Sequence, residues 1–231
     1  MMETKPQLTT ANKQGLPWSV YVLIAANLIP LFGVLFFQWE AQVVLALYWI
    51  ENLIIGAFNV VKMLSVSAIK KQFQGLLMVA FFIVHYGLFC AGHGMLLTDL
   101  LGLEGAVESI EFQYEADGLL SIFQEGLAVF LMFVERLSPA ILYGILALLL
   151  SRLVSFIEHF ILRGELFNTD VNKLMGAPYA QIIIMHVGLI LGAMALNYFQ
   201  SPIWLLAIIV VFKMVLDYTQ HKKRHQLTNN H

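Results

Sequence analysis

The feature that most constrains the fold is a series of apolar blocks, each about 20 residues long. An α-helix of about 20 residues rises about 30 Å, which is the thickness of the hydrocarbon core of a bilayer. Hydrophobic residues make up 59% of the 231-residue chain and charged residues 12%, whereas soluble domains average about 45–50% and about 25%. The net charge of −2 offers no basic surface for nucleic acid. The sequence therefore predicts an all-α polytopic membrane protein that sits in a lipid bilayer and does not bind nucleic acid.

We predict one membrane domain over residues 18–218, flanked by a polar tail at residues 1–17 and a basic tail at residues 219–231. The domain is expected to be a bundle of six transmembrane helices, and the sequence leaves its oligomeric state open. The predicted spans, in chain order, are Trp18–Phe37, Val43–Ser65, Leu76–Leu97, Pro139–Leu162, Tyr179–Tyr198 and Ile203–Tyr218.

The basic residues predict the orientation of this bundle. If the N-terminus lies inside, the inner segments hold nine Lys and Arg residues, whereas the outer segments hold only Arg136. Cytoplasmic loops of membrane proteins carry such an excess of basic residues. Both termini are therefore predicted to be cytoplasmic.

The outer loop at residues 98–138 contains an acidic stretch, Glu104–Asp117, and one further apolar segment. This segment, Leu119–Val134, is short and is interrupted by polar residues and glycine at 124–126. If it crossed the membrane, the basic loops that follow would all move to the outer side, against the positive-inside pattern. We therefore predict an interfacial or re-entrant helix on the outer face.

The second predicted span carries polar side chains on one face. At about 100° per residue, Glu51, Asn52, Asn59 and Lys62 fall within an arc of about 100°. The Lys62 ammonium can extend to the inner surface. Glu51 cannot reach water, because it lies about 14 Å below the outer end of the span. A carboxylate at that depth needs partners on other helices, so this face is predicted to point into the bundle.

Histidines also lie inside the predicted spans, at positions 85, 93, 159 and 186. His85 and His93 are eight residues apart, so they share a helix face and are about 12 Å apart along its axis. Counted from the outer span ends, His85 and His186 both lie about 18 Å down, close to the depth of Glu51. His93 lies nearer the outer face and His159 nearer the inner face.

Imidazole and carboxylate together are a common ligand set for transition metals. We predict a metal site built from His85, His93, His186 and Glu51 and holding zinc, iron or manganese. Glu51 would act as a ligand or as the general base for a metal-bound water. Such a site suits hydrolysis or oxidation of a lipid-like, membrane-embedded substrate, although the sequence does not establish that the protein is an enzyme. Residues expected to support the site or form a proton path are Asn52, Asn59, Arg152 and His159.

Three other functions stay open from the sequence. His85 and His186 could be the axial ligands of a haem b, with nearby glycines admitting the ring. Intramembrane ionisable groups spread over the depth of the bilayer also suit a proton or ion transporter. In the simplest alternative, an assembly protein, the same polar groups only lock the bundle together. The groups that would form the transport path are Glu51, His85, Arg152, His159 and Lys213.

Two motifs connect the chain to a known family. The segment Tyr48–Asn52 (YWIEN), followed by His85–Phe89 (HYGLF) and His93-Gly94, resembles an uncharacterised family of bacterial polytopic membrane proteins, a domain of unknown function. The resemblance covers about residues 18–220 and implies a location in the bacterial inner membrane without implying an activity.

A six-span chain of this size also resembles a rhomboid protease in general shape. The Gly-x-Ser-Gly nucleophile motif of rhomboids is missing, however, since no serine in the spans has those neighbours. A serine nucleophile requires such an activating arrangement, so serine protease activity is not expected.

Overall fold

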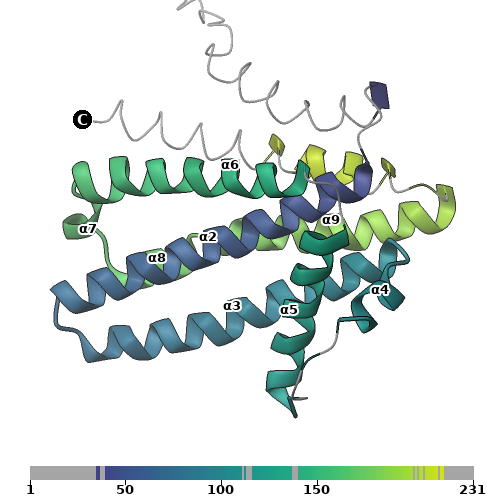
Figure 1. Cartoon of the computed structure of the whole chain (residues 1–231). Coiled ribbons are helices and arrows are strands. Elements are labelled where there is room, and N and C mark those ends of the chain that lie inside the picture. Colours follow the sequence, from purple (N-terminus) through teal and green to yellow (C-terminus); the bar gives the residue numbers. More distant parts are fainter. Residues whose placement is uncertain are drawn as a thin grey trace, which may run out of the picture.

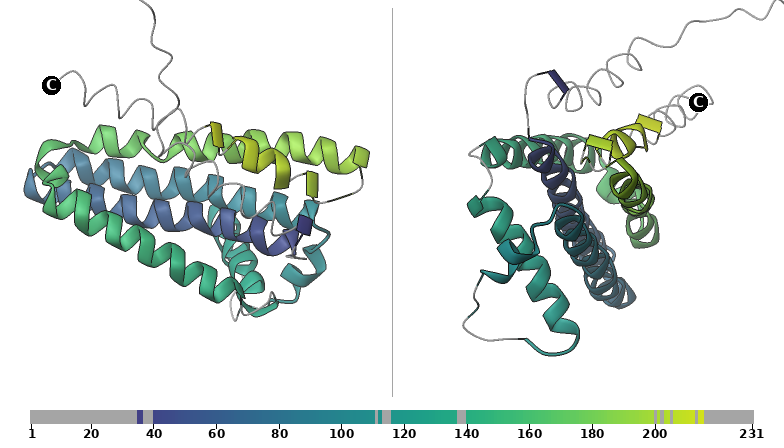
Figure 2. Two further views of the ribbon diagram at one scale, coloured as in Figure 1. Left: turned by 90° about the horizontal axis from the view of Figure 1, so that it is seen from above. Right: turned by 90° about the vertical axis from the view of Figure 1, so that its right-hand side faces the viewer.

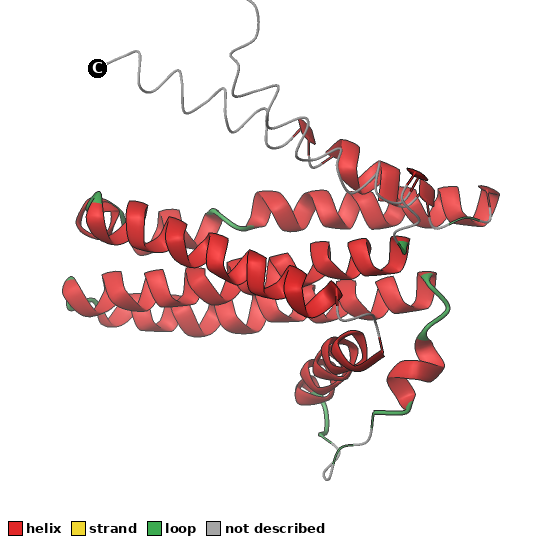
Figure 3. Cartoon of the chain, turned by 45° about the horizontal axis from the view of Figure 1, so that its top comes forward, coloured by secondary structure: helices red, strands yellow, loops and turns green. Residues whose placement is uncertain are grey.

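The structure is a computed structural model that describes residues 35–36, 40–110, 112, 116–136, 140–199, 201, 203–204, 206–212 and 214–215. Regular structure in these residues is entirely helical, as predicted (Figure 3). Apart from residues 35–36, the first predicted span lies outside the described residues, as do Lys213 and both tails.

The helices follow one another closely along the chain. The four longest are α2 (Ala41–Ile69), α3 (Phe73–Leu100), α9 (Tyr179–Phe199) and α5 (Leu119–Arg136). The others are α4 (Glu104–Glu108), α6 (Ala140–Ser155), the π-helix η1 (Phe156–Leu162), α7 (Glu165–Asn168) and α8 (Val171–Gly176).

Within the described residues, four segments are long and apolar enough to cross a membrane. They overlap the second to fifth predicted spans. The sixth predicted span is only partly described, so the count of six stays a prediction. The four segments are Gln42–Ile69, Phe73–Leu100, Leu142–Leu162 and Val171–Leu191.

Helices α2 and α3 form an antiparallel hairpin at the centre of the bundle (Figure 1). The turn at residues 70–72 is tight, because Lys71 adopts a left-handed backbone conformation with φ of 50°. Helix α6 packs against α2, and α9 packs against both α2 and α3. We call the end of the bundle at residues 70–72 the turn end, and the other end the far end.

Helix α5 confirms the prediction of a helix at Leu119–Val134 and lies across the bundle rather than along it (Figures 1 and 2). It packs closely on α3, because a Cβ added at Gly126 would lie 2.8 Å from the Cβ of Ala91. Small residues allow such close approach of two helices. Elsewhere on α5, Leu120 and Leu127 are exposed.

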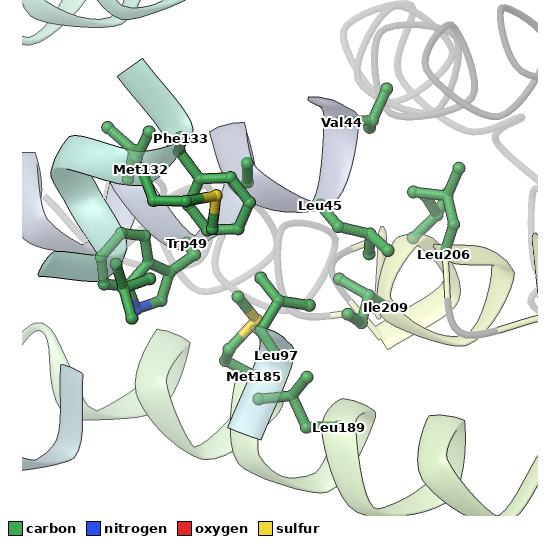
Figure 4. Close-up of a cluster of buried hydrophobic side chains, with 14 of the residues drawn as sticks. Val44, Leu45, Trp49, Leu97, Met132, Phe133, Met185, Leu189, Leu206 and Ile209 are labelled. Atoms are coloured by element: carbon green, nitrogen blue, oxygen red, sulfur yellow. The ribbon is translucent and has the colours of Figure 1, made fainter. Parts of the chain in front are cut away.

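The main apolar core lies in the far half of the bundle, where α2, α3, α5 and α9 meet (Figure 4). Trp49 of α2 is its largest member, and only 1% of its surface is exposed. The Trp49 indole N–H donates to the carbonyl of Cys90 at 2.8 Å, and its ring lies against Gly94, where an added Cβ would be 2.6 Å from Cζ2. Hydrogen bonding the indole lets this large ring be buried without an unpaired donor.

Helix α6 has the opposite character, because most of its apolar side chains are exposed. Leu146, Leu150 and Val154 expose 55%, 60% and 60% of their surface. Soluble proteins seldom leave so continuous an apolar face in water, whereas a bilayer accommodates it. Burial on α6 is thus limited to the side that faces α2.

Candidate functional site

The polar face of α2 contacts several other helices in turn. At its centre, Arg152 of α6 donates from Nη2 to Oε1 of Glu51 at 2.6 Å. The Glu51 side chain is only 8% exposed, and that of Arg152 is 38% exposed. The predicted interior position of Glu51 is thus explained by a partly buried ion pair that joins α2 to α6.

Nearer the turn end, α2 contacts the segment that leads into α9. Asn59 donates from Nδ2 to the carbonyl of Leu174 in α8 at 2.9 Å. The Lys62 ammonium pairs with Oε2 of Glu165 in α7 at 3.2 Å, and it lies 5.1 Å from the ring centre of Phe160. These contacts bring three helices that are distant in sequence onto one face of α2.

Asn52 belongs to the same face but is turned toward α3. The Asn52 side chain donates from Nδ2 to the backbone carbonyl of Tyr48. The backbone carbonyl of Asn52 accepts from the Tyr86 hydroxyl at 3.0 Å. The Asn52 side chain is buried, and its Oδ1 accepts no hydrogen bond within the described part of the chain. Asn52 therefore supports the α2–α3 contact.

The histidines pair across α3 and α9. Nδ1 of His85 lies 2.7 Å from the hydroxyl of Tyr179, and Nε2 of His93 lies 2.9 Å from Nδ1 of His186. The depth estimate had placed His85, not His93, level with His186. The estimate assumes that the spans end in one plane, but α9 continues from His186 to Phe199, whereas α3 continues from His93 only to Leu100.

The residues predicted to form one metal site are therefore distributed among three pairs. Glu51 pairs with Arg152, His85 with Tyr179, and His93 with His186. Within the described residues, no group of three or more His, Cys, Asp or Glu side chains lies close enough to hold a metal ion. His93 and His186 are the two predicted ligands that the structure brings together.

A pocket of about 690 Å³ opens beside the polar face of α2 toward the turn end. Its walls come from α2, from α6 and η1, from α7 and from the start of α9. We call it the turn-end pocket. Its polar lining side chains are Asn59, Lys62, Arg152, Ser155, His159, Arg163, Glu165 and Gln181.

The π-helix η1 shapes one wall of this pocket. The amide of Arg163 donates to the carbonyl of Glu158, five residues back, at 3.0 Å, and short π-helical segments are common at functional sites. Ser155, His159 and Arg163 follow one another about a turn apart and all reach the pocket. Gly164, with φ of 74°, then ends the helix in a conformation that favours glycine.

A second pocket, of about 880 Å³, lies at the far end between α3, α4 and α5. Glu104, Glu108 and Glu125 are among its lining residues, and no described basic side chain lines it. The two pockets thus carry opposite charge.

Several residues of the turn-end pocket did not stand out in the sequence. Glu165 lies in a segment that resembles an ordinary inner loop between two spans, and Gln181 lies next to that segment.

Tyr179, the partner of His85, is only the start of a predicted span in the sequence, although a tyrosine there can reach a histidine on a neighbouring helix. The spacing of these residues could have indicated the two pairs. His85 and His93 on α3 are almost as far apart in sequence as Tyr179 and His186 on α9.

The fold and these contacts define the class of the protein. Its regular structure in the described residues is all helical, with helices long enough to cross a membrane that are joined by polar pairs. The chain belongs to DUF6498, a family of unknown function whose sequence model matches residues 9–231. This confirms the predicted resemblance to a domain of unknown function. No curated protein and no solved structure matches the chain.

Replacing Asn59 with leucine should destabilise the protein, because the buried carbonyl of Leu174 would lose the shorter of two hydrogen bonds and keep the one from the Ala177 amide at 3.3 Å. The net contribution of one such hydrogen bond is about 0.5–1.5 kcal/mol. Asn168→Leu is the matched control, since Asn168 also donates to a backbone carbonyl, that of Gly164, but is exposed to solvent. Thermal unfolding in detergent should show a lower midpoint for Asn59→Leu than for Asn168→Leu. Equal midpoints would contradict the structural role of this contact.

Proposed function

We propose that the chain is an integral protein of the bacterial inner membrane, with the turn end and both termini on the cytoplasmic side. Two observations support this orientation. Lys70 and Lys71 form the turn itself, and Arg163 and Lys173 lie in the connection at the same end, as basic residues do in cytoplasmic loops. Helix α5, which crosses the bundle in its far half, would lie toward the outer face of the membrane.

Within that membrane, the protein would bind a lipid-like, membrane-embedded substrate in the turn-end pocket. The observation that carries this proposal is the pocket itself, which places charged and amide side chains beside apolar ones at the level of spanning helices. A volume of about 690 Å³ lies within the range of small-molecule sites. Ile55, Phe58 and Phe156 supply apolar walls, which would suit the part of an amphiphile next to its head group.

The pocket is also reached from the lipid side of the bundle. Ser155 and His159 line it and are exposed, and Ile157 and Ile161 beside them expose 42% and 47% of their surface. A substrate could thus enter sideways from the bilayer without first passing through water. The polar groups of the pocket would serve a carrier as well as an enzyme.

A second candidate function is metal binding at the histidine pair of α3 and α9. The distance of 2.9 Å between Nε2 of His93 and Nδ1 of His186 favours it. Two nitrogens bound at about 2.0–2.1 Å to one tetrahedral metal are about 3.3 Å apart, so exchanging the shared proton for a metal would need only a small movement. This arrangement suits two ligands of a zinc, iron or manganese site better than a haem between His85 and His186, because each of those two histidines has another partner.

Filling the turn-end pocket should remove the bound amphiphile. Ser155→Trp places a large ring in the pocket, whereas Ser151→Trp, one turn earlier on the exposed side of α6, lies outside its lining. Native mass spectrometry of protein extracted gently from membranes should show a retained amphiphile in wild type and in Ser151→Trp, and its loss in Ser155→Trp. Equal retention by both variants, or none by folded wild type, would contradict binding at this pocket.

The metal hypothesis predicts a different result at the other site. Elemental analysis of protein purified without a histidine tag should find a transition metal in wild type that is lost in His93→Gln and in His186→Gln. His159→Gln is the control, because His159 is exposed and, among the described residues, contacts by hydrogen bond the backbone carbonyl of Ser155 one turn earlier. A folded wild-type protein without metal, or unchanged metal in His186→Gln, would exclude this candidate.

A further inference from the structure

We propose that the turn-end pocket recognises a phosphate group, supplied by the head group of an anionic phospholipid from the adjacent leaflet. The inference rests on the proposed function, since it names the chemical class of the amphiphile that would occupy the pocket. The three residues that would bind the phosphate are Lys62, Arg152 and Arg163.

The charge of the lining is the first argument. Three basic side chains and one carboxylate, that of Glu165, line the pocket. With His159 neutral, the lining carries a formal charge of +2, from +3 and −1. The far-end pocket, by contrast, is lined by three glutamates. Basic pockets between spanning helices on the cytoplasmic side are typical binding sites for anionic lipid head groups.

The availability of donors is the second argument. An arginine has five N–H donors in a planar fork. Within the described residues, Arg152 uses Nη2 for Glu51, and Arg163 uses Nη2 for Glu158. The other donors of both guanidinium groups are thus available for an oxygen-rich anion, and Ser155 and Gln181 add neutral donors from the same walls.

The placement of the carboxylates is the third argument. Glu51 and Glu158 contact the two arginines but do not line the pocket. Each guanidinium group is thus held by a carboxylate that is not part of the pocket lining. A planar guanidinium fixed in this way suits two-point binding of phosphate oxygens. Glu51 is then a positioning residue for Arg152 and not a ligand of the anion.

The lipid, and not free phosphate, is favoured as the source because of what surrounds the pocket. The exposed lining residues lie on a helix whose neighbouring side chains are apolar and exposed, among them Ile157, Ile161 and Leu162. Acyl chains attached to a phosphate in the pocket would lie along this face and cover it. Free phosphate has no acyl chains and would leave this apolar face uncovered.

The test uses lipids that share acyl chains and differ only in phosphate. Delipidated full-length protein in detergent is titrated with phosphatidic acid or with diacylglycerol, and bound lipid is counted by native mass spectrometry. Phosphatidic acid should bind more tightly than diacylglycerol. The variant Lys62→Gln/Arg163→Gln should lose about 25-fold in affinity for phosphatidic acid, at about fivefold per cation near a lipid phosphate. Lys71→Gln/Lys173→Gln removes two cations at the same end that do not line the pocket, and it should bind like wild type.

Competition with inorganic phosphate separates the two sources of the group. Failure of inorganic phosphate to displace phosphatidic acid is expected for a lipid site, and full displacement would overturn the assignment to a lipid. Diacylglycerol binding as tightly as phosphatidic acid, or unchanged binding in Lys62→Gln/Arg163→Gln, would overturn phosphate recognition. In that case the Ser155→Trp variant distinguishes a lipid pocket without phosphate selectivity from the absence of lipid binding at this pocket. If it still releases both lipids, the substrate pocket stands without phosphate selectivity, and if it releases neither, both proposals fail.

Discussion

A carboxylate buried among apolar helices must be paired, and the pairing of Glu51 with Arg152 is the contact on which the rest of the arrangement depends. An unpaired charge in hydrocarbon costs several kcal/mol. The pair at 2.6 Å removes that cost only if α6 lies beside α2 at this height. Because most apolar side chains of α6 are exposed, the ion pair fixes its register together with the close packing of Gly144 on Leu47.

The other polar contacts act in the same way at other heights. Asn59 and Lys62 attach α8 and α7 to α2, and the two histidine contacts attach α9 to α3. Polar side chains are effective between helices in lipid because apolar side chains gain nothing by leaving it. The turn-end pocket lies among these contacts, because Asn59, Lys62 and Arg152 also line it.

The sequence predicts the helical class, the positions of four spans and the inward polar face of α2, because each depends on residues close together in the chain. It does not predict the pairs. The depth of His85 suggested His186 as its neighbour, but the true neighbour, Tyr179, depends on how far α9 extends at the far end, and that is set by packing. Likewise Glu51 was assigned to a metal because its nearest predicted polar groups were histidines. Only the position of α6 next to α2 shows that a guanidinium is closer.

The π-helix could not be predicted from the sequence for a similar reason. Residues 156–162 are as apolar as the helix before them, and nothing in their spacing separates a π-turn from an α-turn. The wider turn becomes visible only in the hydrogen bond between Arg163 and Glu158. Because this turn presents part of the pocket wall, the site could not have been assembled from the sequence alone.

The central claim is that Glu51 and Arg152 stabilise the bundle as a pair, and a double-mutant cycle tests it most directly. Glu51→Leu, Arg152→Leu and the double variant would be compared with wild type by thermal unfolding in one detergent. Each single variant should be destabilised, because it removes the ion-pair partner of the remaining charged side chain, and the double variant should regain much of that loss. The expected coupling is about 1–3 kcal/mol, reduced by the partial exposure of Arg152. Additive effects of the two substitutions would contradict the account.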